Sequence, residues 1–427
     1  MNNTVRNPWL WIPTLYFGQG LPYVAVMTLA VVLYKNLGVD NTAIALYTSW
    51  LYLPWVIKPL WSPLVDLAGT KRRWIVALQF LVGAALAGVA LTLPGSDFFR
   101  MTLAMFWLMA FASATHDIAA DGFYMLSLPE KRQAAFVGVR STFYRLANLG
   151  GQGGLVYLAG LWTEQLGSAS AAWVRVMTLL AVLFVVLALW HLWALPRPAD
   201  DCPAARHGTF VADALEVFAA FFRLPGIVRV LTFLLLYRFA EAQLLKLVTP
   251  FILDPLAAGG LGLKTQDVGI AYGTVGVTAL TVGGLLGGWV ISRVGLKRAL
   301  WPLIFSMHVP NVVFVALALW QPQALALVSV AVGVEQFGYG FGFTAYMVYM
   351  LMVASGPDGH NPHKTAHYAL CTGFMALGMM LPGMWSGWLQ SQLGYLNFFI
   401  WVCIATLPSF AAAAWIRIDP AFGRRSE

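Results

Sequence analysis

Charged residues are scarce in this chain of 427 residues, and their scarcity argues against a soluble protein. Asp, Glu, Lys and Arg make up 10% of the sequence, whereas about 25% is usual in a soluble domain. Hydrophobic residues make up 59%, and the mean hydropathy is +0.72. This composition does not fit a water-soluble enzyme and indicates a membrane protein.

The sequence also lacks the residue patterns of metal and nucleotide chemistry. Its three cysteines, Cys202, Cys371 and Cys403, match neither a disulfide framework nor the spacing of a metal site. HExxH, paired CxxC, GxxxxGK and nucleophile-elbow motifs are missing. We therefore expect no metal and no cofactor, and we expect a protein that is neither an enzyme nor an ATP-driven pump.

Alternating ten-residue strands of a membrane barrel are absent, and the apolar runs are long. Helices are then the remaining way to satisfy the backbone in lipid, with about 20 residues needed for each crossing. The first run follows Arg6 without a small-residue cleavage pattern, so it is expected to be a retained span. We expect twelve transmembrane helices at about 8–34, 42–66, 74–93, 100–127, 134–161, 172–194, 227–252, 268–291, 299–319, 324–353, 366–389 and 395–416.

A polar interruption divides these spans into two sets of six. It begins at Pro196 with PRPADDCPAARHG and continues into DALEVFAAFF, a stretch with the pattern of an amphipathic surface helix. The sequence thus predicts an N-terminal six-helix bundle at 1–194, a cytoplasmic linker at 195–226 and a C-terminal six-helix bundle at 227–427.

The basic residues predict the orientation in the membrane. If both termini are cytoplasmic, most of the 26 Lys and Arg residues fall on the cytoplasmic side, and only Lys35, Arg100, Arg175 and Lys264 fall opposite. This bias predicts an N-in, C-in topology and accounts for most of the net charge of +8. The expected partner is the lipid bilayer, and nucleic acid is not expected.

Four acidic residues within the spans are candidates for proton coupling, because a charge at mid-membrane costs about 2.5 to 3.5 kcal/mol. Asp117 and Asp121 lie one turn apart on one helix face, and Glu241 and Glu335 lie in later spans. A structural alternative pairs Asp121 with a basic residue such as Arg132. The glycines that follow Glu335 are expected to thin the helix beside a cavity.

Basic and polar residues in the spans are candidates for substrate binding. Arg145 can either neutralise Asp117 or hold an anionic substrate. Arg238 can pair with Glu241, three positions away, whereas Lys246 is expected to face a different wall. Snorkelling to the interface and ordinary core packing are alternatives for Lys58 and His367. The candidate set is Arg145, Arg140, Tyr124, Lys58, Arg238, Lys246 and His367.

Short basic loops follow the second span of each half, PLVDLAGTKRR at 63–73 and GGWVISRVGLKR at 287–298. The first loop resembles the cytoplasmic loop of the major facilitator superfamily, and the second has Ser292 where an acid is expected. The resemblance implies two bundles rocking about a central site. It also implies a cytoplasmic gate at Asp66, Lys71, Arg72 and Arg73.

A series of motifs along the chain resembles the AmpG-type muropeptide permeases, a branch of that superfamily related to acetyl-CoA transporters and some siderophore permeases. In order they are GQGLPY (18–23), VIKPLWSPLVD (56–66), HDIAADGFY (116–124), YRLANLGGQGG (144–154), LYRFAEA (236–242), VEQFGYGFG (334–342) and KTAHYAL (364–370). The departures from the branch, which include His116, Arg140 and Lys246, leave the substrate open.

The resemblance implies a monomeric, proton-coupled importer of a small anionic molecule in the bacterial inner membrane. We expect this substrate to be an anhydro-muropeptide. Acetyl-CoA and siderophore transport remain alternatives, as do a membrane-bound transferase and a sensor that does not transport.

Overall fold

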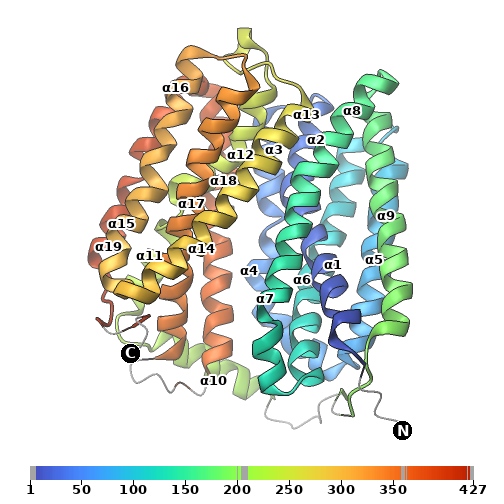
Figure 1. Ribbon diagram of the computed structural model, residues 1–427, viewed down its shortest axis with the longest axis vertical. Coiled ribbons are helices and arrows are strands. Elements are labelled where there is room, and N and C mark those ends of the chain that lie inside the picture. Colours follow the sequence, from blue (N-terminus) through green and yellow to red (C-terminus); the bar gives the residue numbers. More distant parts are fainter. Residues whose placement is uncertain are drawn as a thin grey trace. The chain divides into compact units, whose positions relative to one another are not determined.

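A computed structural model describes residues 6–199, 201–202, 210–356, 361, 363–420 and 422–423. The side chains at 63–64, 66–67, 130–131, 134 and 210–214 lie outside this description. Throughout the described residues the chain is helical, with turns and short loops between the helices and no β-strand (Figure 1). The all-α class expected from the long apolar runs is confirmed.

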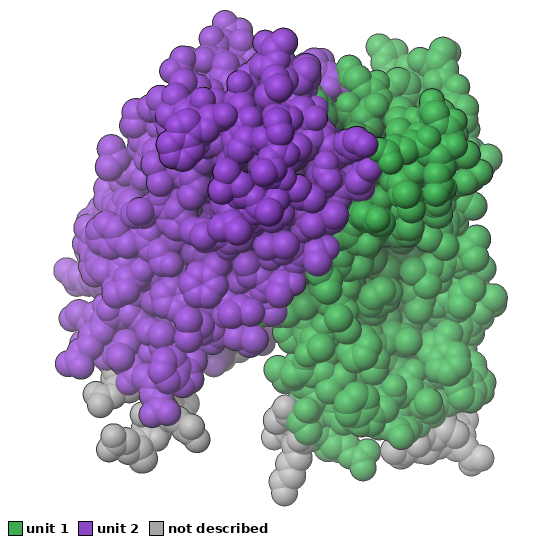
Figure 2. Space-filling model, turned by 45° about the horizontal axis from the view of Figure 1, so that its top comes forward, with its two compact units in different colours: residues 1–38, 60–206 green, residues 39–59, 207–427 purple. Residues whose placement is uncertain are grey.

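Two compact units divide the chain (Figure 2). Unit 1 consists of Met1–Gly38 and Leu60–Arg206, and unit 2 consists of Val39–Pro59 and His207–Glu427. The segment Val39–Pro59 therefore belongs, by its contacts, with the second half of the sequence. The division at 1–194, 195–226 and 227–427 stays a prediction.

Unit 1 is built from long helices joined by tight turns. α5 packs against both α6 and α9, and α1 packs against α7. A π-helical turn at Ala25–Leu29 follows α1 and contacts a second one at Gly150–Leu155, which follows α7. The helices are α1 (Ile12–Val24), α2 (Ala30–Asn36), α5 (Lys71–Thr92), α6 (Phe98–Ser127), α7 (Glu130–Leu149), α8 (Val156–Leu166) and α9 (Ala169–Ala194).

Unit 2 contains most of the remaining helices, and α4 (Leu53–Leu67) begins in it and ends in unit 1. α17 packs against α14 and α15, whereas α18 packs against α3 and α12. The other helices of unit 2 are α3 (Asn41–Trp50), α10 (Phe210–Phe222), α11 (Ile227–Leu236), α12 (Phe239–Leu253), α13 (Thr265–Val268), α14 (Val277–Val294), α15 (Leu296–His308), α16 (Val312–Trp320), α17 (Leu325–Ser355), α18 (Lys364–Ile404) and α19 (Leu407–Trp415).

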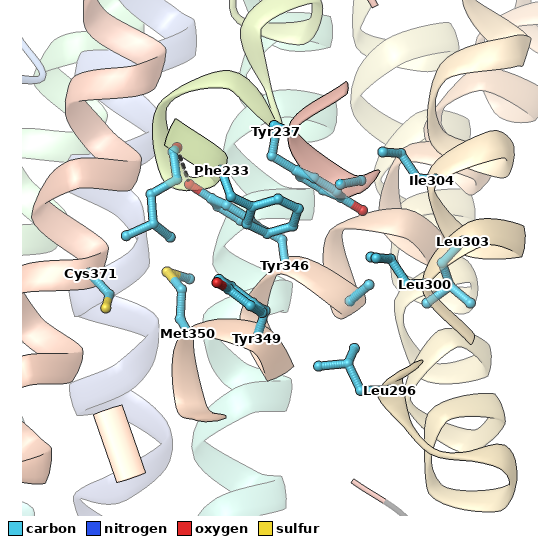
Figure 3. Close-up of a cluster of buried hydrophobic side chains, with 14 of the residues drawn as sticks. Phe233, Tyr237, Leu296, Leu300, Leu303, Ile304, Tyr346, Tyr349, Met350 and Cys371 are labelled. Atoms are coloured by element: carbon cyan, nitrogen blue, oxygen red, sulfur yellow. Dashed lines mark hydrogen bonds between the residues drawn. The ribbon is translucent and has the colours of Figure 1, made fainter. Parts of the chain in front are cut away.

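Aromatic side chains form a core where α11, α15 and α17 meet (Figure 3). The rings of Tyr237 and Tyr346 stack with their centroids 5.0 Å apart, and Phe233 lies against Tyr349 at 4.5 Å. Tyrosine rings in such a core also need partners for their hydroxyl groups. Tyr237 donates a hydrogen bond to the backbone oxygen of Gly342, at 2.9 Å.

The membrane spans can be compared with the predicted ranges within the described residues. Eight helices are long and apolar enough to cross a membrane, or nine if the bent pair Leu215–Phe222 and Ile227–Leu253 is one span. The predicted spans 366–389 and 395–416 lie in the single helical segment Lys364–Trp415, which is interrupted by non-helical backbone at Gly394. The count of twelve and the N-in, C-in topology stay predictions.

Candidate functional site

A break in a buried helix positions the first group of polar side chains in unit 2. α11 ends at Leu236 and α12 begins at Phe239, and Arg238 between them has non-helical backbone angles of φ −109° and ψ 19°. The break removes the helical donors for the preceding carbonyl groups. Tyr346 donates to the oxygen of Leu234 at 2.6 Å, and Ser409 donates to the oxygen of Leu236 at 2.8 Å. These two side chains satisfy the backbone at the break.

The acidic candidates of unit 2 lie next to this break and next to each other. Glu241 is in the first turn of α12, where the positive end of the helix dipole favours an acid. Glu241 and Glu335 are both 0% exposed, and their carboxyl groups lie within hydrogen-bonding reach of each other. A hydrogen bond between two carboxyl groups requires a proton on one of them. The structure therefore brings together two of the four predicted proton-coupling residues.

Amide side chains complete the surroundings of the acid pair. Asn311 donates to Glu241 Oε2 at 3.4 Å, and Gln336 donates to Glu335 Oε2 at 3.0 Å. The Oε1 atom of each glutamate accepts no hydrogen bond from any described donor. A proton shared between the two acids would satisfy these atoms. No sequence pattern marks Asn311 or Gln336, because an amide in a span costs much less to bury than a charge.

Arg238 lies beside the acid pair and contacts aromatic residues of α17. Its guanidinium donates a hydrogen bond to the hydroxyl of Tyr339, and it lies 4.9 Å from the ring centre of Phe343. The side chain is 8% exposed. A buried guanidinium at a helix break is suited to an anionic group of a ligand.

The expectation that glycines thin α17 beside a cavity is wrong. A Cβ at Gly338 would lie 2.0 Å from the backbone oxygen of Ser306, and one at Gly340 would lie 2.1 Å from that of Leu280. These glycines instead allow α15 and α14 to approach α17 closely. Small residues commonly serve this purpose between membrane helices.

Lys246 points to a different wall of α12 from Glu241, as its spacing predicts. Its Nζ donates to Thr48 Oγ1 of α3 at 2.9 Å and lies 5.2 Å from the ring centre of Tyr52. Lys58 is half-buried in the same unit. His367 lies near the start of α18, where Nδ1 is 2.8 Å from Asn361 Nδ2, and it is not among the residues that contact the acid pair.

In unit 1 an ion pair joins two of the predicted residues. Arg140 on α7 lies 2.7 Å from the carboxylate of Asp121 on α6, and Tyr16 donates to the same carboxylate at 3.2 Å. The guanidinium also lies over the rings of Tyr16 and Tyr124, at 4.4 and 4.8 Å. The partner of Asp121 in this pair is thus Arg140, whereas Arg132, near the start of the same helix α7, is exposed.

Asp117 and Arg145 are both half-buried in unit 1. Asp117 lies one turn before Asp121 on α6, and both carboxylates lie close enough to Tyr144 to interact with it electrostatically. The predicted coupling and binding residues of unit 1 therefore come from the helices α6 and α7.

Three of the four predicted gate residues, Lys71, Arg72 and Arg73, begin α5. The carboxylate of Asp201, from the linker, accepts hydrogen bonds from the backbone N–H groups of Lys71 and Arg72, at 2.7 and 3.0 Å. The Arg72 side chain donates to the backbone oxygen of Leu192, and Arg73 is exposed. The side chain of Asp66 lies outside the described residues. The capping role of Asp201 was not apparent from the sequence, because 130 residues separate it from Lys71.

A second feature that the sequence did not reveal is a buried chain of polar side chains in unit 1. Gln79 bridges two histidines, with contacts of 3.1 Å to His116 Nε2 and 2.8 Å to His191 Nδ1. Thr14 lies 2.9 Å from His191 Nε2. All of these side chains except Thr14 are at most 3% exposed. Each partner comes from a different helix, so the chain depends on the packing of α1, α5, α6 and α9.

The described part of the chain contains no cluster of metal-ligating side chains. Among these residues no group of three or more His, Cys, Asp or Glu side chains could hold a metal ion.

Comparison with known proteins places this arrangement in a family. The sequence pattern of the Major Facilitator Superfamily matches residues 14–363. The chain is also similar to the anhydromuropeptide permease of Escherichia coli strain K12, with 27% identity over 408 residues, which cover 92% of this chain and 76% of that protein.

Solved structures show the same fold. A crystal structure of the nucleoside transporter NupG matches with a TM-score of 0.70 and 15% identity, covering 96% of this chain and 100% of that one. A bacterial homologue of the human lysosomal transporter Spinster matches with a TM-score of 0.69 and 14% identity, covering 97% of this chain and 96% of that one.

Proposed function

Because the chain belongs to the major facilitator superfamily, we propose that it couples proton movement to the import of anhydromuropeptides. The protein is a transporter rather than an enzyme, and it is a multi-pass protein of the bacterial inner membrane. The substrate is proposed from the permease of Escherichia coli strain K12, which is similar over 92% of this chain. Proton coupling is proposed from the side chains of unit 2.

The buried acid pair carries the proposal of proton coupling. Two ionised carboxylates in contact and away from water are strongly disfavoured, so a pair such as Glu241 and Glu335 holds a proton between them. A carrier that reaches water on one side of the membrane and then on the other can take up this proton and release it. Arg238 lies close enough to act on Glu241 electrostatically and can stabilise the ionised form.

The ion pair of unit 1 supports a second contribution to coupling. Asp121 and Arg140 are only partly buried, with side-chain exposures of 44% and 29%, so water or a ligand can reach them. A proton on Asp121 would weaken its attraction for Arg140. The freed guanidinium could then bind a carboxylate of the substrate. Asp117 and Arg145, from the same two helices, are proposed to assist in the same way.

Uptake into proteoliposomes tests the proposal. We expect wild-type protein to accumulate a labelled anhydromuropeptide when an inward proton gradient is imposed, and to equilibrate it without one. Glu335→Gln removes the shared proton site while keeping the shape of the side chain. This variant should lose accumulation but keep exchange of external for internal substrate.

Glu216→Gln provides a matched control, because Glu216 is exposed on α10. It should accumulate substrate as the wild type does. Accumulation by Glu335→Gln at the wild-type level would contradict the role of the acid pair. Accumulation by the wild type that ignores the gradient would contradict proton coupling altogether. Strong uptake of acetyl-CoA or a ferric chelate in place of the muropeptide would contradict the substrate.

A further inference from the structure

We propose that Lys246, Thr48 and Ser49 form a subsite in unit 2 that binds a carboxylate of the transported substrate. This inference rests on the proposed function and specifies which substrate group unit 2 recognises. The subsite lies on the wall of α12 opposite the acid pair and uses residues of α3.

The first observation is a buried lysine without an acidic partner. Lys246 is 4% exposed, and its contacts in the described chain are the hydroxyl of Thr48 and the ring of Tyr52. No carboxylate among the described residues forms an ion pair with it. A buried charge normally requires an opposite charge, because a hydroxyl and a ring face replace only part of its hydration. A bound anion would supply the missing charge.

The second observation is an unused hydrogen-bond donor beside the lysine. Ser49 Oγ is 0% exposed and has no described hydrogen-bond partner. Gly383 of α18 packs closely against both groups, because a Cβ there would lie 2.6 Å from Ser49 Oγ and 3.5 Å from Lys246 Cγ. The Ser49 hydroxyl and the lysine side chain therefore lie next to the same glycine, and a ligand reaches them when the helices around this glycine separate.

The donors at this position match a carboxylate. Thr48 donates to the backbone oxygen of Ile44 at 2.7 Å and accepts from Lys246, so it orients the ammonium and occupies one of its three N–H groups. Two N–H groups of Lys246 and the O–H of Ser49 remain. A carboxylate offers two oxygens with about four acceptor sites, which can use all three donors. The peptide part of an anhydromuropeptide carries such carboxylates.

Polar bonds hold the start of α3 against α18. Asn41, the first residue of α3, donates to Gln390 Oε1 at 3.0 Å and to the hydroxyl of Tyr395 at 2.8 Å. Tyr395 donates to Asp254, which follows α12, at 2.6 Å. Water can replace bonds of this kind when they open. Movement of α3 as a whole, with Thr48 and Ser49 in its last turn, would uncover Lys246, and its return would enclose the bound carboxylate.

A comparison of two probes tests the subsite. One probe is a labelled anhydromuropeptide with free peptide carboxylates, and the other is the same compound with these carboxylates converted to primary amides. Uptake into proteoliposomes gives kcat/KM for each. We expect the wild type to prefer the free acid by about 10- to 100-fold, the range for one charged hydrogen-bonding partner.

Lys246→Gln should lose this preference, because uptake of the free acid falls while uptake of the amide changes little. Lys246→Arg should keep part of the preference, and Lys297→Gln, at an exposed lysine of α15, should keep all of it. If Lys246→Gln does not fold, Ser49→Ala removes one donor with little change in volume and should lower the preference severalfold.

Two results would overturn the subsite alone. One is that Lys246→Gln and Ser49→Ala each reduce uptake of the acid and of the amide by the same factor, which indicates a structural role. The other is a wild type that transports the acid and the amide equally well. A wild type that transports neither probe overturns the proposed function, and the subsite with it.

Discussion

Removing the Tyr346 hydroxyl tests whether side chains hold the helix break that positions Arg238. Tyr346→Phe leaves the carbonyl oxygen of Leu234 without its donor in a site where Tyr346 is 0% exposed. An unsatisfied buried carbonyl costs about 1 to 3 kcal/mol in soluble proteins. Hydrogen bonds between membrane helices average about 0.6 kcal/mol, with a maximum of about 1.7. Since the bond is short, at 2.6 Å, we expect a loss of about 1 to 2 kcal/mol.

Equilibrium unfolding in mixed detergent micelles measures this loss. Tyr349→Phe is the matched control, because Tyr349 belongs to the same aromatic core but its hydroxyl makes no hydrogen bond within the described chain (Figure 3). The double variant Tyr346→Phe with Ser409→Ala should lose less stability than the sum of the losses of the two single variants. Both residues donate to carbonyl groups of the same helix break, so their effects are coupled. Equal stability of Tyr346→Phe and Tyr349→Phe would refute this account of the break.

Two further substitutions test packing and the ion pair. Gly340→Ala places a Cβ about 1 Å too close to the backbone of α14, so we expect it to cost at least about 1 to 3 kcal/mol in the same unfolding assay. Gly288→Ala, whose Cβ would meet its nearest neighbour at 3.9 Å, should cost nothing, and equal behaviour of the two variants would contradict the packing argument. Arg140→Gln should change stability by less than about 1 kcal/mol, because the pair with Asp121 is partly exposed. It should nevertheless reduce muropeptide uptake at least tenfold, and wild-type uptake would remove the pair from the transport mechanism.

The sequence alone was sufficient to predict a helical membrane protein and to locate the charged residues within its apolar segments. Long apolar runs leave the backbone no partner except within helices, so the all-α class could be predicted from the sequence. Because a charge within the membrane is energetically costly, the sequence alone marks Asp121, Arg140, Glu241 and Glu335 as candidates for functional residues.

The partners of these residues could be found only in the folded chain. Glu335 is 94 positions after Glu241, and Thr48 is 198 positions before Lys246, so no local pattern links them. The glycines of α17 show the same limit, because a small residue suits both a cavity wall and a close helix contact, and only the position of the Leu280 and Ser306 oxygens distinguishes the two. The hydropathy of a segment is a property of its own residues, and hence visible in the sequence. A contact depends on where distant helices pack, and tertiary structure alone decides that.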